Sequence, residues 1–190
     1  MSLAKLVKIL GAVCLLIGLI YWLWLFFLGS AQVAVSTRAI TDLSRYQEIR
    51  ESYQDSPLIQ HFPETFPPAA TDIRLEYLPK FLQGGSYFIV SYILPSEQIN
   101  EIRIQADEIA KYKYRTGESN QLTDELPDDI LKPPFQIDTT TAESSSQTYE
   151  VFILDVQDTG GAGSEWNHGY SYGIAIDDVA RRVIYWHEYW

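Results

Sequence analysis

The sequence predicts an α+β domain with a mainly antiparallel sheet of about five strands and two helices on one face, preceded by a single transmembrane helix. Three observations lead to this fold class. An uncharged apolar run opens the chain. Short stretches rich in β-branched and aromatic residues follow it, separated by turn residues. Two further stretches carry apolar residues three or four positions apart, as on one face of a helix.

The apolar run extends from Ile9 to Leu28 and contains no charged or amide side chain. Its roughly 20 residues would form a helix about 30 Å long, which matches the hydrocarbon core of a bilayer. Aromatic residues gather at its C-terminal end, and Lys5 and Lys8 precede it, which favours a cytoplasmic N-terminus. We therefore expect residues 1–8 in the cytoplasm, a single-pass signal anchor in the lipid bilayer of the inner membrane at 9–28, and an extracytoplasmic domain.

A cleaved signal peptide is the alternative, because Gly29 and Ala31 are small residues at a suitable spacing for a cleavage site. The apolar run is longer than the apolar core of most signal peptides, and bulky aromatic residues lie next to the candidate site. These two features favour an uncleaved anchor.

Beyond the run, residues 29–40 are predicted to be a tether and residues 41–190 a folded domain. The domain's predicted elements are a helix at 41–53, strands at 72–78 and 86–94, a helix from Pro95 that ends before Gly117, and strands at 149–156, 170–176 and 182–187. Lys111, Lys113 and Arg115 are assigned to the last turns of the second helix, where basic residues are favourable. Residues 117–148 are polar and are predicted to be a mobile loop.

Charge excludes some classes of partner. Residues after position 30 carry 12 basic and 25 acidic side chains, a net charge of −13. Nucleic acid and anionic membrane surfaces both require a basic face, so we expect neither as a partner. The only cysteine, Cys14, lies in the apolar run, so the domain has no disulfide and depends on its apolar core.

The glycine-rich loop at 158–169 is the most unusual local sequence. Glycines allow a backbone to approach a ligand closely, so Asp158, Glu165, Trp166 and His168 are candidate ligand-binding residues. The loop lacks the lysine of a phosphate-binding loop, and the three histidines of the chain lack the spacing of a zinc site. The plainer interpretation is a long hairpin connection whose Trp166 packs on the sheet. The sequence predicts no catalytic residues, metal or cofactor.

Several short runs resemble a group of small uncharacterised bacterial membrane-tethered or lipoprotein domains. The runs are His61-Phe62-Pro63, Phe81-Leu82-Gln83-Gly84-Gly85, Tyr172-Gly-Ile-Ala-Ile176 and Val183-Ile-Tyr-Trp186. The resemblance covers much of residues 61–190 and implies a bacterial envelope setting. It assigns no activity to any residue.

Two functions remain open from the sequence. The first is an envelope protein without enzymatic activity, whose domain binds a protein partner or a small ligand near the membrane; the anchor and the high tyrosine and tryptophan content favour it. The second is a membrane-tethered hydrolase or metal-dependent enzyme with its site around Asp158, Glu165 and His168.

Overall fold

The computed structural model describes residue 11 and residues 14–25, 38–54, 56–80, 85–116, 149–162 and 168–190. The chain divides into two units, Met1–Arg38 and Ala39–Trp190. In the first unit, Gly11 and residues 14–25 are helical, and the other positions of the predicted span lie outside the described residues. In the described part of the chain, no helix is both long enough and apolar enough to cross a membrane.

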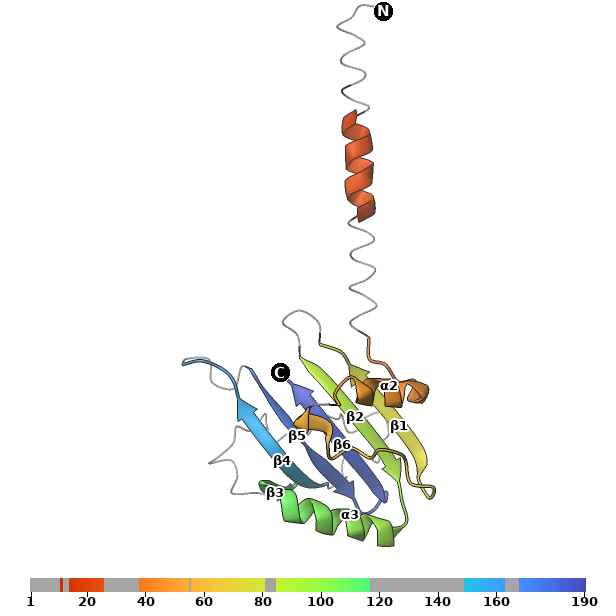
Figure 1. Ribbon diagram of the computed structural model, residues 1–190, viewed down its shortest axis with the longest axis vertical. Coiled ribbons are helices and arrows are strands. Elements are labelled where there is room, and N and C mark those ends of the chain that lie inside the picture. The colour runs from red at the N-terminus through yellow and green to blue at the C-terminus, as the bar shows by residue number, and fades with distance from the viewer. Residues whose placement is uncertain are drawn as a thin grey trace, which may run out of the picture. The chain divides into compact units, whose positions relative to one another are not determined.

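The second unit is built on one six-stranded antiparallel sheet in the order β1-β2-β6-β5-β4-β3 (Figure 1). Its strands are β1 (Thr71–Leu78), β2 (Ser86–Ile93), β3 (Tyr112–Arg115), β4 (Glu150–Asp158), β5 (Gly169–Asp177) and β6 (Arg182–Tyr189). The α+β class and the antiparallel sheet are confirmed, and β1, β2, β4, β5 and β6 lie within two residues of their predicted bounds. The C-terminal strand β6 is central, because it pairs with β2 on one side and β5 on the other.

The sheet has a sixth strand, β3, that the sequence did not predict. Lys113 and Arg115 were assigned to the last turns of the second helix, but they lie in β3, and the helix α3 (Ser96–Ile109) ends before them. Tyr112 and Tyr114 face one side of the sheet, whereas Lys113 approaches Glu150 and the Phe152 ring on the other. This alternation with period two is a strand signal. The apolar spacing of the preceding helix and the cluster of basic residues concealed it.

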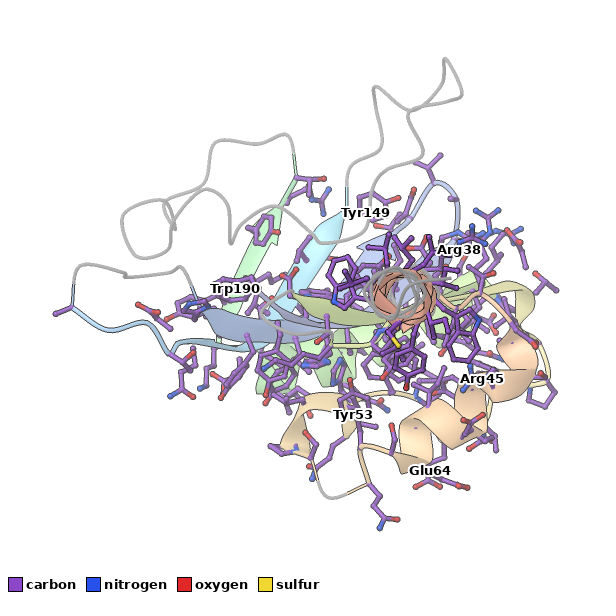
Figure 2. The ribbon with its side chains drawn as sticks, turned by 90° about the horizontal axis from the view of Figure 1, so that it is seen from above. Arg38, Arg45, Tyr53, Glu64, Tyr149 and Trp190 are labelled. Carbon is purple, nitrogen blue, oxygen red and sulfur yellow. The ribbon has the colours of Figure 1, made fainter. Side chains whose placement is uncertain are left out.

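The helical elements lie on one face of the sheet, here called the first face. They are η1 (Leu43–Arg45), α2 (Tyr46–Glu51), η2 (Pro57–Ile59) and α3. Tyr46 and Ile49 of α2, and Ile99 and Ala106 of α3, are buried in one cluster with the inward side chains of the strands. In Figure 2, Tyr53, which follows α2, and Tyr149 of the opposite face lie on the two sides of the sheet. Both predicted helices therefore pack on the same face.

The opposite, second face has a separate core cluster that includes Trp186, Ile184 and Val151. No helix of the described residues packs on it. Gly173 of β5 lies directly beneath Trp186 of β6, and Gly169 lies beneath Trp190. A Cβ atom at Gly173 would come 2.5 Å from the Trp186 ring and would also clash with the carbonyl oxygen of Phe152. The glycines thus provide the space that the tryptophan rings occupy.

A β-bulge in β4 changes the direction of the side chains that follow it. Ile153 pairs with Gly173, whereas Asp155 pairs with the adjacent Tyr172, so β4 contains one extra residue between these pairs. Without the bulge, Asp155 would share the second face with Val151 and Ile153. The bulge places it beside Tyr172 on the first face.

Gly173→Ala is expected to lower the free energy of unfolding by about 2–4 kcal/mol, because the added methyl group displaces the Trp186 ring and the β4 backbone. Urea unfolding of the full-length protein in detergent measures the change. Val179→Ala is the control, since Val179 is 93% exposed in the turn between β5 and β6. Equal stability of the Gly173 variant and the wild-type protein would contradict the close packing.

Candidate functional site

The structure describes residues 158–162 and 168–169 of the predicted ligand-binding loop. Asp158 ends β4, and its Oδ1 accepts a hydrogen bond of 2.7 Å from the Gly160 amide. The Thr159 amide donates to the carbonyl oxygen of the exposed His168 at 2.7 Å, so β4 and β5 are joined as a hairpin. Asp158 and His168 therefore lie near each other across this hairpin. Glu165 and Trp166 lie outside the described residues, so the proposed site at 158–169 stays a prediction.

A different group of side chains forms an accessible aromatic surface on the first face. It comprises five partly exposed tyrosines, here called the tyrosine surface: Tyr53, Tyr77, Tyr170, Tyr172 and Tyr189. Their rings form two contacting groups, Tyr53 with Tyr77 and Tyr170 with Tyr172 and Tyr189, and the buried ring of His187 joins the two. Tyr170 lies 5.8 Å from Tyr189 and 6.3 Å from Tyr172 between ring centroids, and Tyr53 lies 6.4 Å from Tyr77.

Strand register explains why these rings meet. Tyr77 of β1 pairs with Phe88 of β2, which pairs with His187 of β6, which pairs with Tyr172 of β5. These four residues form one row across the first face. Tyr189 and Tyr170 form the next row toward the end of β6. Tyr53 reaches the rows from the segment after α2 and contacts Tyr77, Phe88 and His187.

A few polar and charged groups border the tyrosine surface. The Tyr170 hydroxyl donates a hydrogen bond of 2.7 Å to Gln157, and the Lys80 ammonium lies 5.3 Å from the centre of the Tyr189 ring. Lys111 forms an ion pair of 2.5 Å with Asp155, the residue that the bulge turns to this face. The border therefore offers hydrogen-bonding groups and both signs of charge.

Two histidines contact the tyrosines. His187 is fully buried, and its ring is edge-on to Tyr53 and Tyr189 at 5.6 and 5.1 Å. His61 stacks on Tyr172 at 5.3 Å, and its Nε2–H donates to the carbonyl oxygen of Trp186 at 3.1 Å. Burial lowers the pKa of His187 to about 4 and that of His61 to about 3. Both rings are therefore neutral at physiological pH.

Glu188 places a carboxyl group among aromatic side chains on the second face. Glu188 lies between Trp186 and Trp190 along β6, and pairs with Tyr87 of β2 and Ser171 of β5. The Ser171 hydroxyl donates a hydrogen bond of 2.7 Å to its carboxylate. Burial raises the pKa of Glu188 to about 7, although the hydrogen bond from Ser171 acts in the opposite direction.

The tyrosine surface is suited to binding. Tyrosine provides a large rigid contact area together with a hydroxyl that hydrogen-bonds, and it is enriched in protein interfaces. Within the described residues, no group of three or more His, Cys, Asp or Glu side chains is arranged to hold a metal ion. The arrangement of these rings therefore offers stacking and hydrogen bonding to an incoming surface.

Sequence reasoning did not identify the tyrosine surface or Glu188. The last predicted strand, at 182–187, contains His187, and this placement is confirmed. The signal for Glu188 was present in the alternation Trp186-x-Glu188-x-Trp190, which puts a carboxyl group in the middle of an aromatic strand face. Recognising the tyrosine surface required the strand order, which the sequence did not provide.

Glu188→Gln is expected to stabilise the protein at pH 8 by about 1–3 kcal/mol. A raised pKa means that the stability contributed by neutral Glu188 is complete below pH 4.5 and is lost as the pH rises through about 7. Glutamine keeps an acceptor for Ser171 without the charge. Urea unfolding at pH 8 and pH 5 checks this, and a gain that is no larger at pH 8 would contradict it.

Comparison with known proteins adds no function to this geometry. No protein-family model, no curated protein and no solved structure matches the chain. The resemblance to bacterial membrane-tethered domains therefore stays a prediction.

Proposed function

We propose that this protein is a single-pass membrane protein of the bacterial envelope, whose extracytoplasmic domain binds a protein partner through the tyrosine surface. The observation that carries the proposal is the gathering of five partly exposed tyrosines on one face of the sheet, in two contacting groups that the buried His187 joins. An aromatic patch of this kind on a soluble domain typically marks an interaction site.

The width of the tyrosine surface favours a protein over a small molecule. Its first row runs from Tyr77 on β1 to Tyr172 on β5, across three interstrand spacings, or about 14 Å. Tyr53 adds a contribution from outside the sheet. Partly exposed rings on three strands and on the segment after α2 match the scale of a partner's surface patch.

The path of the chain supports a partner near the membrane. Ile40 pairs with Tyr77 through two backbone hydrogen bonds of 2.7 and 2.9 Å, so the chain enters the domain beside the tyrosine surface. If residues 9–28 span the bilayer, the 11 or so residues before Ile40 extend at most about 40 Å. The partner would then be a membrane protein or a protein held close to the membrane.

The partner is tested by photo-crosslinking of the full-length protein in intact cells. A benzophenone amino acid at Tyr172 is expected to give a protein adduct of defined mass, and the same group at the exposed Val179 is the matched control. Tyr170→Ala is expected to weaken the adduct at position 172 about tenfold, because a buried interface tyrosine contributes 1–2 kcal/mol or more. Equal adducts at both positions would contradict a specific partner, and no adduct at either position would favour a small ligand.

The anchor is tested by alkaline carbonate extraction of membranes. The wild-type protein is expected to remain in the membrane pellet. The double variant Leu16→Arg with Leu19→Arg is expected to be extracted, because each arginine in the middle of a span costs about 2.5–3.5 kcal/mol. Extraction of the wild-type protein would contradict the anchor, and an N-terminus that begins after Ala31 would indicate a cleaved signal peptide.

A further inference from the structure

His187 occupies an unusual position for a titratable residue. It is 0% exposed at the centre of the sheet, and among the described residues neither of its ring nitrogens has a hydrogen-bond partner. A buried imidazole normally has at least one partner, because leaving a buried donor or acceptor unpaired is costly. The neutral ring is tolerated because aromatic edges and faces surround it.

No neighbour of His187 among the described residues carries a negative charge that would stabilise its protonated form. Across the strands it faces Phe88 and Tyr172, and along β6 it lies between Tyr185 and Tyr189. Tyr53 contacts the His187 ring from the segment after α2, and the Lys80 ammonium lies over the Tyr189 ring, 5.3 Å from its centre. Burial is the only cause that lowers the pKa of His187, so no described carboxylate offsets it. The nearest acid along the row, Asp155, is already paired with Lys111.

His61 repeats this arrangement where η2 meets the sheet. Its Nε2–H is used in the bond to Trp186, and its buried Nδ1 has no partner among the described residues. Burial is the largest cause that lowers its pKa, and the neighbouring His187 lowers it further. Two neutral imidazoles therefore lie at the junction of the sheet with the α2 and η2 layer. The titratable groups that face them are tyrosines.

We propose that the two histidines make the α2 and η2 layer an acid-sensitive cover, which separates from the sheet at low pH and takes Tyr53 and His61 away from the tyrosines of the sheet. The consequence for binding rests on the proposed function, whereas the separation itself does not. The cover is the part able to move, since β6 is hydrogen-bonded to β2 and β5 along its whole length. The layer is held mainly by the packing of Tyr46, Ile49, Leu58, Ile59 and Phe62.

The sign of the pH effect follows from the lowered pKa values. Above about pH 6.5 both the closed and the open states contain neutral histidine, so the pH has no effect. Below about pH 6.5, the histidines of the open state bind protons. In the closed state His187 stays neutral until the pH falls to about 4, so acid favours opening. For His187 alone, opening at pH 5 is expected to be about thirtyfold more favourable than at pH 7.5.

Hydrogen–deuterium exchange of the full-length protein in detergent at pH 7.5 and pH 5, corrected for intrinsic exchange rates, tests the proposal. The amides of Ser52, Tyr53 and Phe62 are hydrogen-bonded within the cover, whose short helices do not persist once they leave the sheet. These amides are therefore expected to lose about thirtyfold in protection, while β5 and β6 stay protected. His187→Phe is expected to abolish the loss, because phenylalanine fills the site and cannot bind a proton. His168→Phe, at an exposed histidine, is the matched control and is expected to retain the loss.

Three results would overturn the proposal. The first is protection of the cover that does not depend on pH. The second is an acid-induced loss of protection that persists in His187→Phe, and the third is a loss of protection that β5 and β6 share equally with the cover. If His187→Phe does not fold, the titration of His187 in the wild-type protein is followed by NMR. A midpoint near pH 6.5 would overturn the proposal, whereas a midpoint near pH 4 supports it. Crosslinking at pH 7.5 is independent of these readouts, so its failure would count against the proposed partner alone.

Discussion

The pairing of β6 with β2 on one side and β5 on the other is the constraint on which the rest of the domain depends. Side chains alternate along a strand, so every residue of β6 is assigned to one of two faces. Tyr185, His187 and Tyr189 face the helices, and Trp186 and Glu188 face the opposite side. A shift of one residue would exchange the two sets. The aromatic rows of the first face and the tryptophans of the second face thus depend on the same register.

The glycines of β5 show how strongly that register is specified. Gly173 and Gly169 stand opposite Trp186 and Trp190, and any side chain at either position would collide with the indole ring and with the β4 backbone. In a shifted pairing, the indole rings would meet Tyr172 or Ile174 instead of Gly173. The register is therefore set by the complementary shape of two adjacent strands as well as by hydrophobicity.

The sequence predicted the class of the fold because local patterns carry it. The alternation in β1, the β-branched composition of β2 and β6, and the glycine-rich turn before β5 each reported a strand. It did not predict β3, whose four residues follow α3 with a gap of two and contain the basic residues that a helix end favours. The sequence also did not predict the bulge in β4, because an extra residue in a strand leaves no local sequence signal comparable to that of a turn.

The candidate site depends on information that no local pattern contains. Tyr46, Tyr92 and Tyr185 are buried, whereas Tyr53, Tyr170 and Tyr189 are partly exposed. Their neighbours in the sequence do not separate the two groups, because the buried Tyr46 and the partly exposed Tyr53 are both flanked by polar residues. What separates them is the strand order and the position of α2, which decide which rings are covered. A count of tyrosines therefore indicated a binding surface or a core equally well, and the sheet topology was needed to distinguish them.

His187 and Glu188 show how adjacent residues acquire opposite electrostatic behaviour from one strand. Burial lowers the pKa of His187 on the first face and raises the pKa of Glu188 on the second. Desolvation favours the neutral form of each group, which is the base without its proton and the acid with it. Histidine thus lowers stability as the pH falls below 6.5, and glutamate lowers it as the pH rises above 4.5. Between these values both effects act on β6, so a change of pH in either direction introduces charge next to the central strand.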